Sequence, residues 1–206
     1  MLSEMLRQAQ PGTRQRQKEQ TRRSLLSAAR KILAQRGLAQ TTTREIATEA
    51  GVAAGTFFVH FPDVSALVDA LLDEHVAQAL DKALGSAPAQ AGLVAELLHV
   101  CSTLFDSYAE RPELSRAYIA GSLFRQGSGQ MSARLAGFQR WVIARIDLAV
   151  QRGEIPEIDR ELAFMSFFSL YFGVLVAGLN GLMPRERQLS LLQAAMSRLL
   201  LLEHVT

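Results

Sequence analysis

The sequence predicts an all-α fold of about nine helices. Apolar residues recur every three or four positions along most of the 206-residue chain, and no stretch alternates apolar and polar residues with a period of two. Apolar residues make up 49% of the chain, which is enough for a hydrophobic core and excludes a wholly disordered protein. Glycine and proline interrupt the pattern at intervals, as they do between helices.

Charge is unevenly distributed along the chain. Residues 1–60 hold ten Lys and Arg against four Asp and Glu, a net charge of +6, and the remaining residues carry a net charge of −4. A basic segment on an acidic body is typical of a protein that binds nucleic acid or an anionic membrane. A solvated basic tail produces the same charge, so charge alone does not choose among these three.

The cysteine content and the first residues bear on where the protein works. Cys101 is the one cysteine and has no partner within the chain, which is typical of a reducing compartment. The first thirty residues lack the apolar core of a signal peptide, so we expect a cytoplasmic protein.

The pattern divides the chain into three segments. Residues 1–16 have weak periodicity and contain Pro11-Gly12, which predicts a flexible basic arm. Residues 17–62 are expected to form three helices, and residues 63–206 a larger helical domain. The expected helices run from about Gln17 to the stop at Gly37, over 43–50 and 54–60, from the N-cap Asp63 to about Leu84, over 94–108, from Pro112 onward, over 132–152 ending at Gly153, and over 159–182 and 185–203.

Residues 41–61 carry the pattern of a helix-turn-helix. Thr42 followed by Glu45 is the signature of a capping box at a helix start. Gly51 permits the left-handed backbone conformation that a sharp turn between helices requires, and Val52 and Phe57 can anchor the second helix on the first. In this motif the second helix enters the major groove of DNA. A helical hairpin whose small residues serve only packing has the same pattern.

The residue types of this segment agree with a nucleic-acid partner. Ala53, Ala54 and Gly55 leave the start of the second helix without bulk, so its backbone can approach a phosphate or a base edge. Thr56 can hydrogen-bond a phosphate or meet a thymine methyl group, and Arg44 has the planar fork that suits a guanine edge.

Residues 25–72 resemble the amino-terminal domain of the tetracycline-repressor (TetR) family of bacterial transcription regulators. The matching residues are Ala28-Ala29, Gly37, Thr41-Thr42, Ile46-Ala47, Ala50-Gly51-Val52, Gly55-Thr56 and His60-Phe61-Pro62 before Leu67. The resemblance implies a homodimer that binds a palindromic operator in double-stranded DNA and releases it when an unknown small-molecule effector occupies the larger domain. It also implies a DNA-binding set of Thr42, Thr43, Arg44, Ala54, Gly55, Thr56, Phe58 and His60.

Three positions depart from the pattern of the resembled family. Ala53 stands where Ser is usual, which removes a helix cap that contributes about 1 kcal/mol. Phe58 stands where Tyr is usual, and Val64 stands where Lys is common, so a hydroxyl and a charge are lost. We expect basic residues at the amino-terminal end to compensate through phosphate or minor-groove contacts: Arg14, Arg16, Lys18, Arg22 and Arg23.

Residues 162–184 contain no charged side chain and are long enough to span a membrane. A helix buried on several sides has the same composition, and the glycines and polar residues of this segment favour that alternative. Small residues recur every four positions and predict close helix packing. In the resembled family the last two helices of each subunit form the dimer interface, which implies Ser169, Gly173, Ala177, Gly181, Leu192, Met196 and Leu199.

Aromatic residues and one methionine at helical spacing are candidates for a ligand-binding pocket, although an ordinary core has the same composition. We expect an apolar or aromatic effector of modest size. The candidates are Phe105, Tyr108, Phe124, Phe138, Trp141, Met165 and Phe168.

The sequence offers no catalytic and no metal-binding motif, and no cofactor is expected. No two of the four histidines have metal-ligand spacing, and no nucleophile elbow, phosphate loop or dinucleotide fingerprint occurs. We therefore expect a ligand-responsive repressor that is neither an enzyme nor a membrane protein. Two alternatives stay open: a peripheral membrane-associated helical protein with a basic amino-terminal arm, and an enzyme on a helical scaffold.

Overall fold

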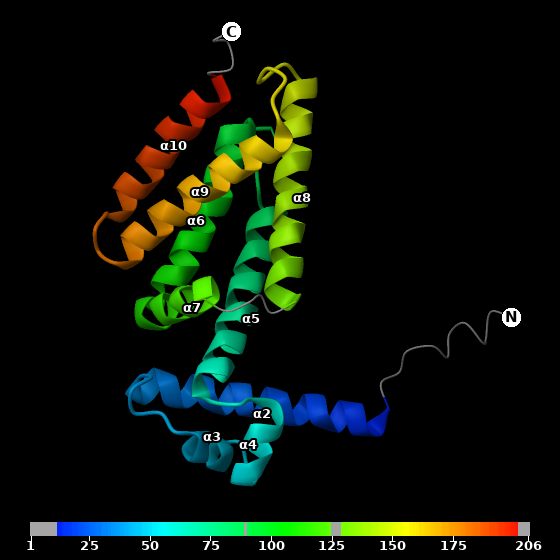
Figure 1. Ribbon diagram of the computed structural model, residues 1–206, viewed down its shortest axis with the longest axis vertical. Helices are drawn as coiled ribbons and strands as arrows, with labels where there is room; N and C mark the ends of the chain where they lie inside the picture. The colour runs from blue at the N-terminus through cyan, green and yellow to red at the C-terminus, as the bar shows by residue number, and fades with distance from the viewer. Residues whose placement is uncertain (1–11, 89, 125–128, 202–206) are drawn as a thin grey trace, which may run out of the picture. The chain divides into compact units, whose positions relative to one another are not determined.

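The computed structural model describes residues 12–88, 90–124 and 129–201, and in this part of the chain the regular secondary structure is entirely α-helix (Figure 1). The predicted all-α fold is confirmed, with nine helices in the described residues. Their bounds are α2 (Thr13–Arg36), α3 (Thr43–Glu49), α4 (Ala54–His60), α5 (Val64–Gly85), α6 (Leu93–Ala109), α7 (Pro112–Phe124), α8 (Gly129–Gln151), α9 (Arg160–Leu179) and α10 (Arg185–Leu201).

Two compact units make up the chain, residues 1–71 and 72–206, and the division falls inside α5. The sequence pattern predicts a boundary between residues 62 and 63. Asp63 caps α5 as predicted, since its side chain accepts a hydrogen bond from the Ala66 N–H at 2.7 Å. Because α5 continues past the loop without a break, the first turns of this helix belong to the amino-terminal unit.

The first described helix begins earlier than the sequence pattern predicts. Helix α2 starts at Thr13 after Gly12, so residues 13–16 are helical and do not belong to a flexible arm. Residues 1–11 of that predicted arm lie outside the described part. The first three turns of α2 are exposed and polar, and their Arg, Gln, Lys and Glu residues have high helix propensity. These turns have no apolar stripe, and an apolar stripe is the pattern by which a helix is predicted from sequence.

The amino-terminal unit is built around the second half of α2. Helix α2 packs on α3, and α3 packs on α4. Leu25 and Ala29 of α2, Ile46 of α3 and Phe57 of α4 are completely buried, and Leu67 joins them from the start of α5. These short helices are held by this shared core, because helices of seven residues are not stable alone.

Helix α6 is central to the second unit and contacts α7, α8, α9 and α10 (Figure 1). Glu96 of α6 is buried and accepts two hydrogen bonds from the Arg145 guanidinium of α8, at 2.5 and 2.6 Å. Such a bidentate pair fixes both the spacing and the register of the two helices. Cys101 is buried in α6, and burial raises its pKa to about 12, so the thiol stays protonated at neutral pH.

Helix α9 is the most apolar helix of the chain and has an uncovered side. Among the described helices it is the one that is long and apolar enough by itself to cross a membrane. Only 33% of its most apolar 18-residue segment is buried within the chain. Its buried side chains pack against α6, α7, α8 and α10. On the other side Leu162 and Met165 are 59% and 51% exposed, and Ser169 and Gly173 are exposed as well.

A close approach between α9 and α10 depends on Gly178. The buried side chain of Gln188 donates a hydrogen bond to the Val174 carbonyl at 3.0 Å and occupies the space that a Cβ atom on residue 178 would need. The side-chain amide therefore ties the start of α10 to the backbone of α9 only if residue 178 is glycine.

We predict that Gly178→Ala lowers the free energy of unfolding by about 1–3 kcal/mol, because the added methyl group displaces the Gln188 amide. Urea unfolding followed by circular dichroism measures this. The matched control is Gly137→Ala in α8, where the nearest atom to an added Cβ is Arg140 Nη2 at 3.9 Å. That variant should be as stable as the parent or up to about 1 kcal/mol more stable. Equal stabilities for the two variants would contradict the prediction.

Candidate nucleic-acid interface

Helix α3 begins with the predicted capping box. The Thr42 hydroxyl accepts a hydrogen bond from the Glu45 N–H at 3.3 Å, and the Glu45 carboxylate accepts one from the Thr42 N–H at 3.1 Å. The Thr42 hydroxyl also donates to this carboxylate at 2.8 Å. The hydrogen bonds from the side chain and backbone of Thr42, and then the charge of Arg36 at 3.0 Å, hold the pKa of Glu45 below its ordinary value. The cap is therefore intact at neutral pH.

The turn between α3 and α4 is made by Gly51, whose φ is +71°. The Val52 N–H donates to the Ala47 carbonyl at 3.0 Å, and the Gly51 N–H donates to the Thr48 carbonyl at 3.1 Å. This pair of bonds is a Schellman motif, which ends a helix with one residue in the left-handed conformation. The turn places α4 against α3, with Phe57 completely buried between the helices.

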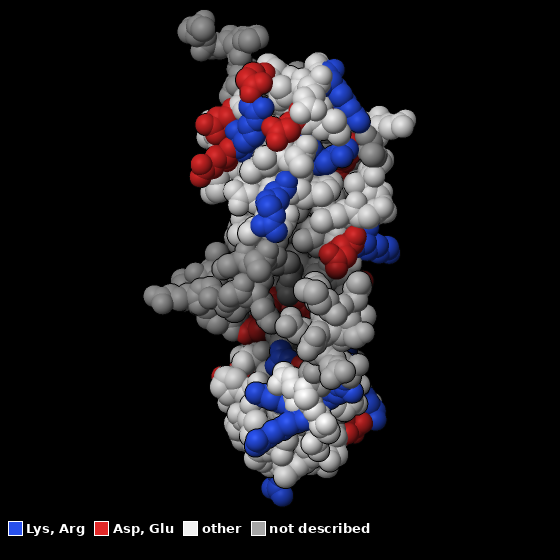
Figure 2. All heavy atoms as spheres, turned by 90° about the vertical axis from the view of Figure 1, so that its right-hand side faces the viewer, with Lys and Arg blue, Asp and Glu red and all other residues white. Residues whose placement is uncertain are grey.

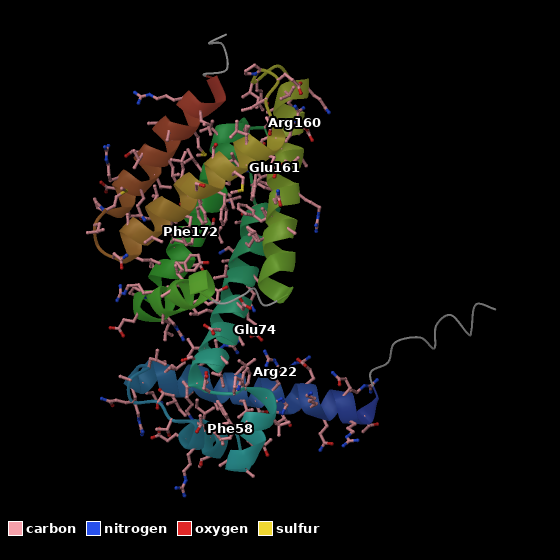
Figure 3. All side chains as sticks on the ribbon, in the orientation of Figure 1. Arg22, Phe58, Glu74, Arg160, Glu161 and Phe172 are labelled. Carbon is pink, nitrogen blue, oxygen red and sulfur yellow. The ribbon has the colours of Figure 1, made fainter. Side chains whose placement is uncertain are left out.

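The outward face of α4 consists of Ala54, Gly55, Phe58 and Val59, all exposed. Phe58 and Val59 are 58% and 69% exposed, and Figure 3 labels Phe58 on this helix. The N-cap residue Ala53 forms no side-chain hydrogen bond, as expected from the absence of serine there. A partner that reaches this face therefore meets small and apolar side chains.

Basic side chains lie on the two helices that precede α4 in the sequence. Arg44, in the first turn of α3, is exposed and its guanidinium pairs with no other described residue. Arg22 of α2, labelled in Figure 3, lies over the Phe61 ring at 4.4 Å. Partial burial, and then the positive charges of Lys18 and Arg22, lower the pKa of His60, so this residue at the end of α4 is neutral at neutral pH. The amino-terminal half of α2 and the end of α4 thus share one positive surface.

Figure 2 shows one face of this surface. Blue Lys and Arg side chains spread over the amino-terminal unit in the lower part of the picture, with little red among them. The exposed basic residues of the first turns of α2 are Arg14, Arg16, Lys18 and Arg23, and the acidic partner Glu19 lies 3.6 Å from Arg23. A surface of this sign attracts a polyanion.

All the residues expected to contact DNA lie in the capping turn of α3 or on α4, and all are exposed or half-buried: Thr42, Thr43, Arg44, Ala54, Gly55, Thr56, Phe58 and His60. The structure adds two qualifications. The Thr42 hydroxyl is committed to the capping box, which leaves it one fewer hydrogen bond for a phosphate. Val59 also belongs to the outward face, and the sequence pattern of so short a helix carried no signal that could have identified it.

The predicted effector residues are placed less uniformly. Phe105, Tyr108 and Phe138 are buried, and Trp141 and Phe168 are half-buried. Met165 is 51% exposed on the uncovered side of α9 and does not join the buried rings, so its assignment to a pocket stays a prediction. The side chain of Phe124 lies outside the described residues.

The buried rings form a layer between α6, α8 and α9. Phe105 stacks on Tyr171 with ring centroids 5.5 Å apart, and Phe138 meets Phe167 at 6.1 Å. Phe168 stacks on Phe172, which Figure 3 labels on α9. Sequence analysis missed several members of this layer: Phe164, Phe167, Tyr171 and Phe172.

The residues predicted for a dimer interface fall into two groups. Ser169, Gly173 and Gly181 are exposed, and Ala177 and Leu199 are half-buried. Leu192 and Met196 are completely buried within the chain, because α10 turns its apolar stripe toward α6 and α9. These two residues support the core of one copy and are not available to a second.

Two buried polar atoms of the described chain have no hydrogen-bond partner, Ser107 Oγ and Arg185 Nη1. Arg185 lies over the Phe105 ring at 5.0 Å, and its Nε and Nη2 bind Asp106 and Ser102 of α6 at 2.6–2.9 Å. Unpaired buried donors of this kind cost free energy unless a ligand satisfies them. Among the described residues, no three His, Cys, Asp or Glu side chains gather closely enough to hold a metal ion.

Comparison with known proteins finds a family match in the amino-terminal unit and solved structures of similar fold over most of the chain. The family model for bacterial regulatory proteins of the tetR family matches residues 25–71, which include α3 and α4. A TetR family transcription regulator from Marinobacter aquaeolei VT8 is 24% identical, with a TM-score of 0.56 over 89% of this chain and 98% of that one. FadR from Bacillus subtilis, solved with stearoyl-CoA, is 20% identical with a TM-score of 0.63 over 89% and 98% of the two chains. FadR from Thermus thermophilus, solved with lauroyl-CoA, is 20% identical with a TM-score of 0.66 over 90% and 95%.

We predict that Gly51→Ala lowers the free energy of unfolding by about 1–2 kcal/mol, because alanine pays that cost in the left-handed conformation. Gly51→Asn should lose less, since asparagine tolerates this conformation better. Gly55→Ala is the control, because nothing lies within 4 Å of its added Cβ and its backbone is helical. Urea unfolding of the full chain gives all three values. An unfolding free energy of Gly51→Ala equal to that of Gly55→Ala would show that the turn does not depend on glycine.

Proposed function

We propose that this chain is a sequence-specific DNA-binding transcriptional repressor of the TetR family, whose model matches residues 25–71. In this proposal the protein is a homodimer that a small molecule releases from a palindromic operator. The observation that carries the proposal is the Gly51 turn, which presents the exposed face of α4 beside the basic half of α2. No enzymatic family is indicated by the comparisons.

The dimensions and charge of the amino-terminal unit suit duplex DNA. The major groove is about 12 Å wide and admits one α-helix, and the outward face of α4 carries nothing bulkier than Phe58. Arg44 lies in the preceding helix with a free guanidinium, which suits the O6 and N7 atoms of guanine. The exposed basic residues of α2 suit phosphate contacts, which supply salt-dependent affinity at any sequence.

The uncovered side of α9 supports a dimer. Leu162, Met165, Ser169 and Gly173 follow one another at spacings of three and four and are all exposed, so they form one stripe along the helix. An exposed apolar patch on a soluble chain marks an interaction surface, and its small residues permit a second helix to approach closely. Paired in this way, two copies can present their α4 helices about 34 Å apart, one turn of DNA.

The effector that we propose is an acyl-CoA or a similar apolar acyl compound. The two FadR proteins of similar fold were solved with stearoyl-CoA and lauroyl-CoA, which have long alkyl chains. In this chain the aromatic layer offers an apolar surface, and Arg185, which lies over the Phe105 ring, offers an unpaired buried Nη1 beside it. Such a ligand releases the operator only if it binds the non-operator conformation more tightly.

Selection of bound fragments from random duplex DNA tests the proposed function. We predict a two-fold symmetric consensus whose half-sites are about one helical turn apart, with retention that weakens as salt is raised. Recovery of unrelated sequences would contradict a sequence-specific regulator. Preferential binding to anionic lipid vesicles would instead support the membrane-associated alternative.

A charge on the α9 stripe separates dimerisation from DNA recognition. Met165→Glu should sediment as a monomer and lose most of its affinity for the symmetric consensus, because each α4 helix then binds one half-site alone. Leu135→Glu is the matched control, since Leu135 is also exposed but lies on α8. A Met165→Glu protein that stays dimeric would show that the interface lies elsewhere.

The effector proposal predicts that lauroyl-CoA lowers the affinity of the protein for the selected operator, whereas free CoA does not, because only the acyl chain reaches the apolar layer. Fluorescence anisotropy of a labelled operator measures the release. Phe105→Ala removes the ring between Arg185 and Tyr171 and should reduce the effect of lauroyl-CoA at unchanged operator affinity. Release of the operator by free CoA to the same extent would contradict the assignment.

A further inference from the structure

The outward face of α4 lacks any hydrogen-bonding side chain. Ala54 and Phe58 form one i,i+4 pair on the exposed side of the helix, and Gly55 and Val59 form the next. Side-chain donors and acceptors near this face belong to Arg44 on α3 and to the half-buried Thr56 and His60. The four exposed side chains of this face therefore offer no hydrogen bond to a base edge.

Phe58 and Val59 are the two large apolar side chains that the described part of the amino-terminal unit leaves exposed, at 58% and 69%. The neighbouring residue Phe57 is completely buried in the core of the same unit. The exposure of Phe58 therefore does not result from a core too small to hold an aromatic ring. Phe58 touches Phe57 edge-on at 5.4 Å between centroids and otherwise extends into solvent. Both side chains therefore suit a partner with an apolar component.

The surroundings of this apolar face identify the chemistry of that partner. Lys18 and Arg22 lie near enough to His60, at the end of the same helix, to lower its pKa, and Arg44 is free on α3. A partner that matches this surface has anionic groups on both sides of an apolar groove, and the groove is wide enough to admit one helix. In duplex DNA the phosphates supply the margin, and the C5-methyl groups of thymine are the apolar groups on the major-groove floor.

We propose that Phe58 and Val59 determine operator specificity by contacting thymine methyl groups, so that the centre of each half-site is read through apolar contacts. Ala54 and Gly55 allow the close approach that these contacts require, since they add almost no bulk one turn earlier. Arg44 supplies hydrogen-bonded readout at the edge of the same half-site. This inference rests on the proposed function and assigns the sequence feature that the regulator reads.

Replacement of thymine by deoxyuridine in the selected operator tests the proposal. Uracil pairs with adenine as thymine does and lacks only the methyl group, so hydrogen bonding and phosphate charge are unchanged. At each thymine under α4 we expect about a fourfold loss of affinity, and about sixteenfold when both half-sites are substituted, from the burial free energy of one carbon per contact. Deoxyuridine outside the α4 positions should have no effect.

Two α4 variants assign the contacts to residues. Phe58→Ala should have the same affinity for operators with thymine or deoxyuridine at one α4 position, because the side chain that contacts that methyl group is gone. Val59→Ala should lose the discrimination at a different position for the same reason. Val59→Thr retains a methyl group and should keep its sensitivity. Lys18→Gln is the control, since loss of a phosphate contact should weaken both operators in the same proportion. Unfolding in urea verifies that each variant is folded.

The outcomes separate this inference from the proposed function. Equal affinity of the parent protein for the thymine and deoxyuridine operators would overturn methyl readout and leave sequence-specific binding in place. A consensus without thymine at the α4 positions would do the same. Failure to select any consensus would overturn the proposed function, and methyl readout with it.

Discussion

The candidate interface depends on one backbone constraint, the left-handed turn at Gly51. The capping box at Thr42 and Glu45 determines where α3 begins, and the Schellman bonds at Gly51 determine where it ends and in which direction the chain continues. Once that direction is set, Phe57 reaches the core and the opposite side of α4 must face solvent. The turn therefore determines which residues of α4 are exposed, because the side of this seven-residue helix opposite Phe57 is the side that the core does not cover.

This part of the molecule was predictable because it depends on local chemistry. Capping boxes, glycine turns and N-caps operate over three to five residues, and Thr42, Gly51 and Asp63 each behave as the sequence predicts. The outward position of Phe58 was predicted only through the family resemblance, whereas Val59 needed the observed helix. Periodicity alone could not assign either residue to a face, because a seven-residue helix gives fewer than two complete turns of pattern.

The errors have a common physical origin, since they concern which side of a helix is covered. Apolar spacing shows that Leu192 and Met196 share a face, but not that α6 and α9 of the same chain cover it. Met165 lies among buried aromatic residues in sequence and yet points to the free side of α9. The early start of α2 at Thr13 was missed for the opposite reason, because a helix with no covered side has no periodic signal.

Under the proposed function, the uncovered stripe on α9 would link protein abundance to gene control. In the proposed dimer, mass action makes the concentration of paired molecules rise with the square of the monomer concentration when the protein is scarce. A modest drop in synthesis, or dilution during growth, then removes operator-competent molecules more steeply than total protein. In that dimer, the exposed Leu162 and Met165 would set a threshold in copy number that an all-polar surface would not provide.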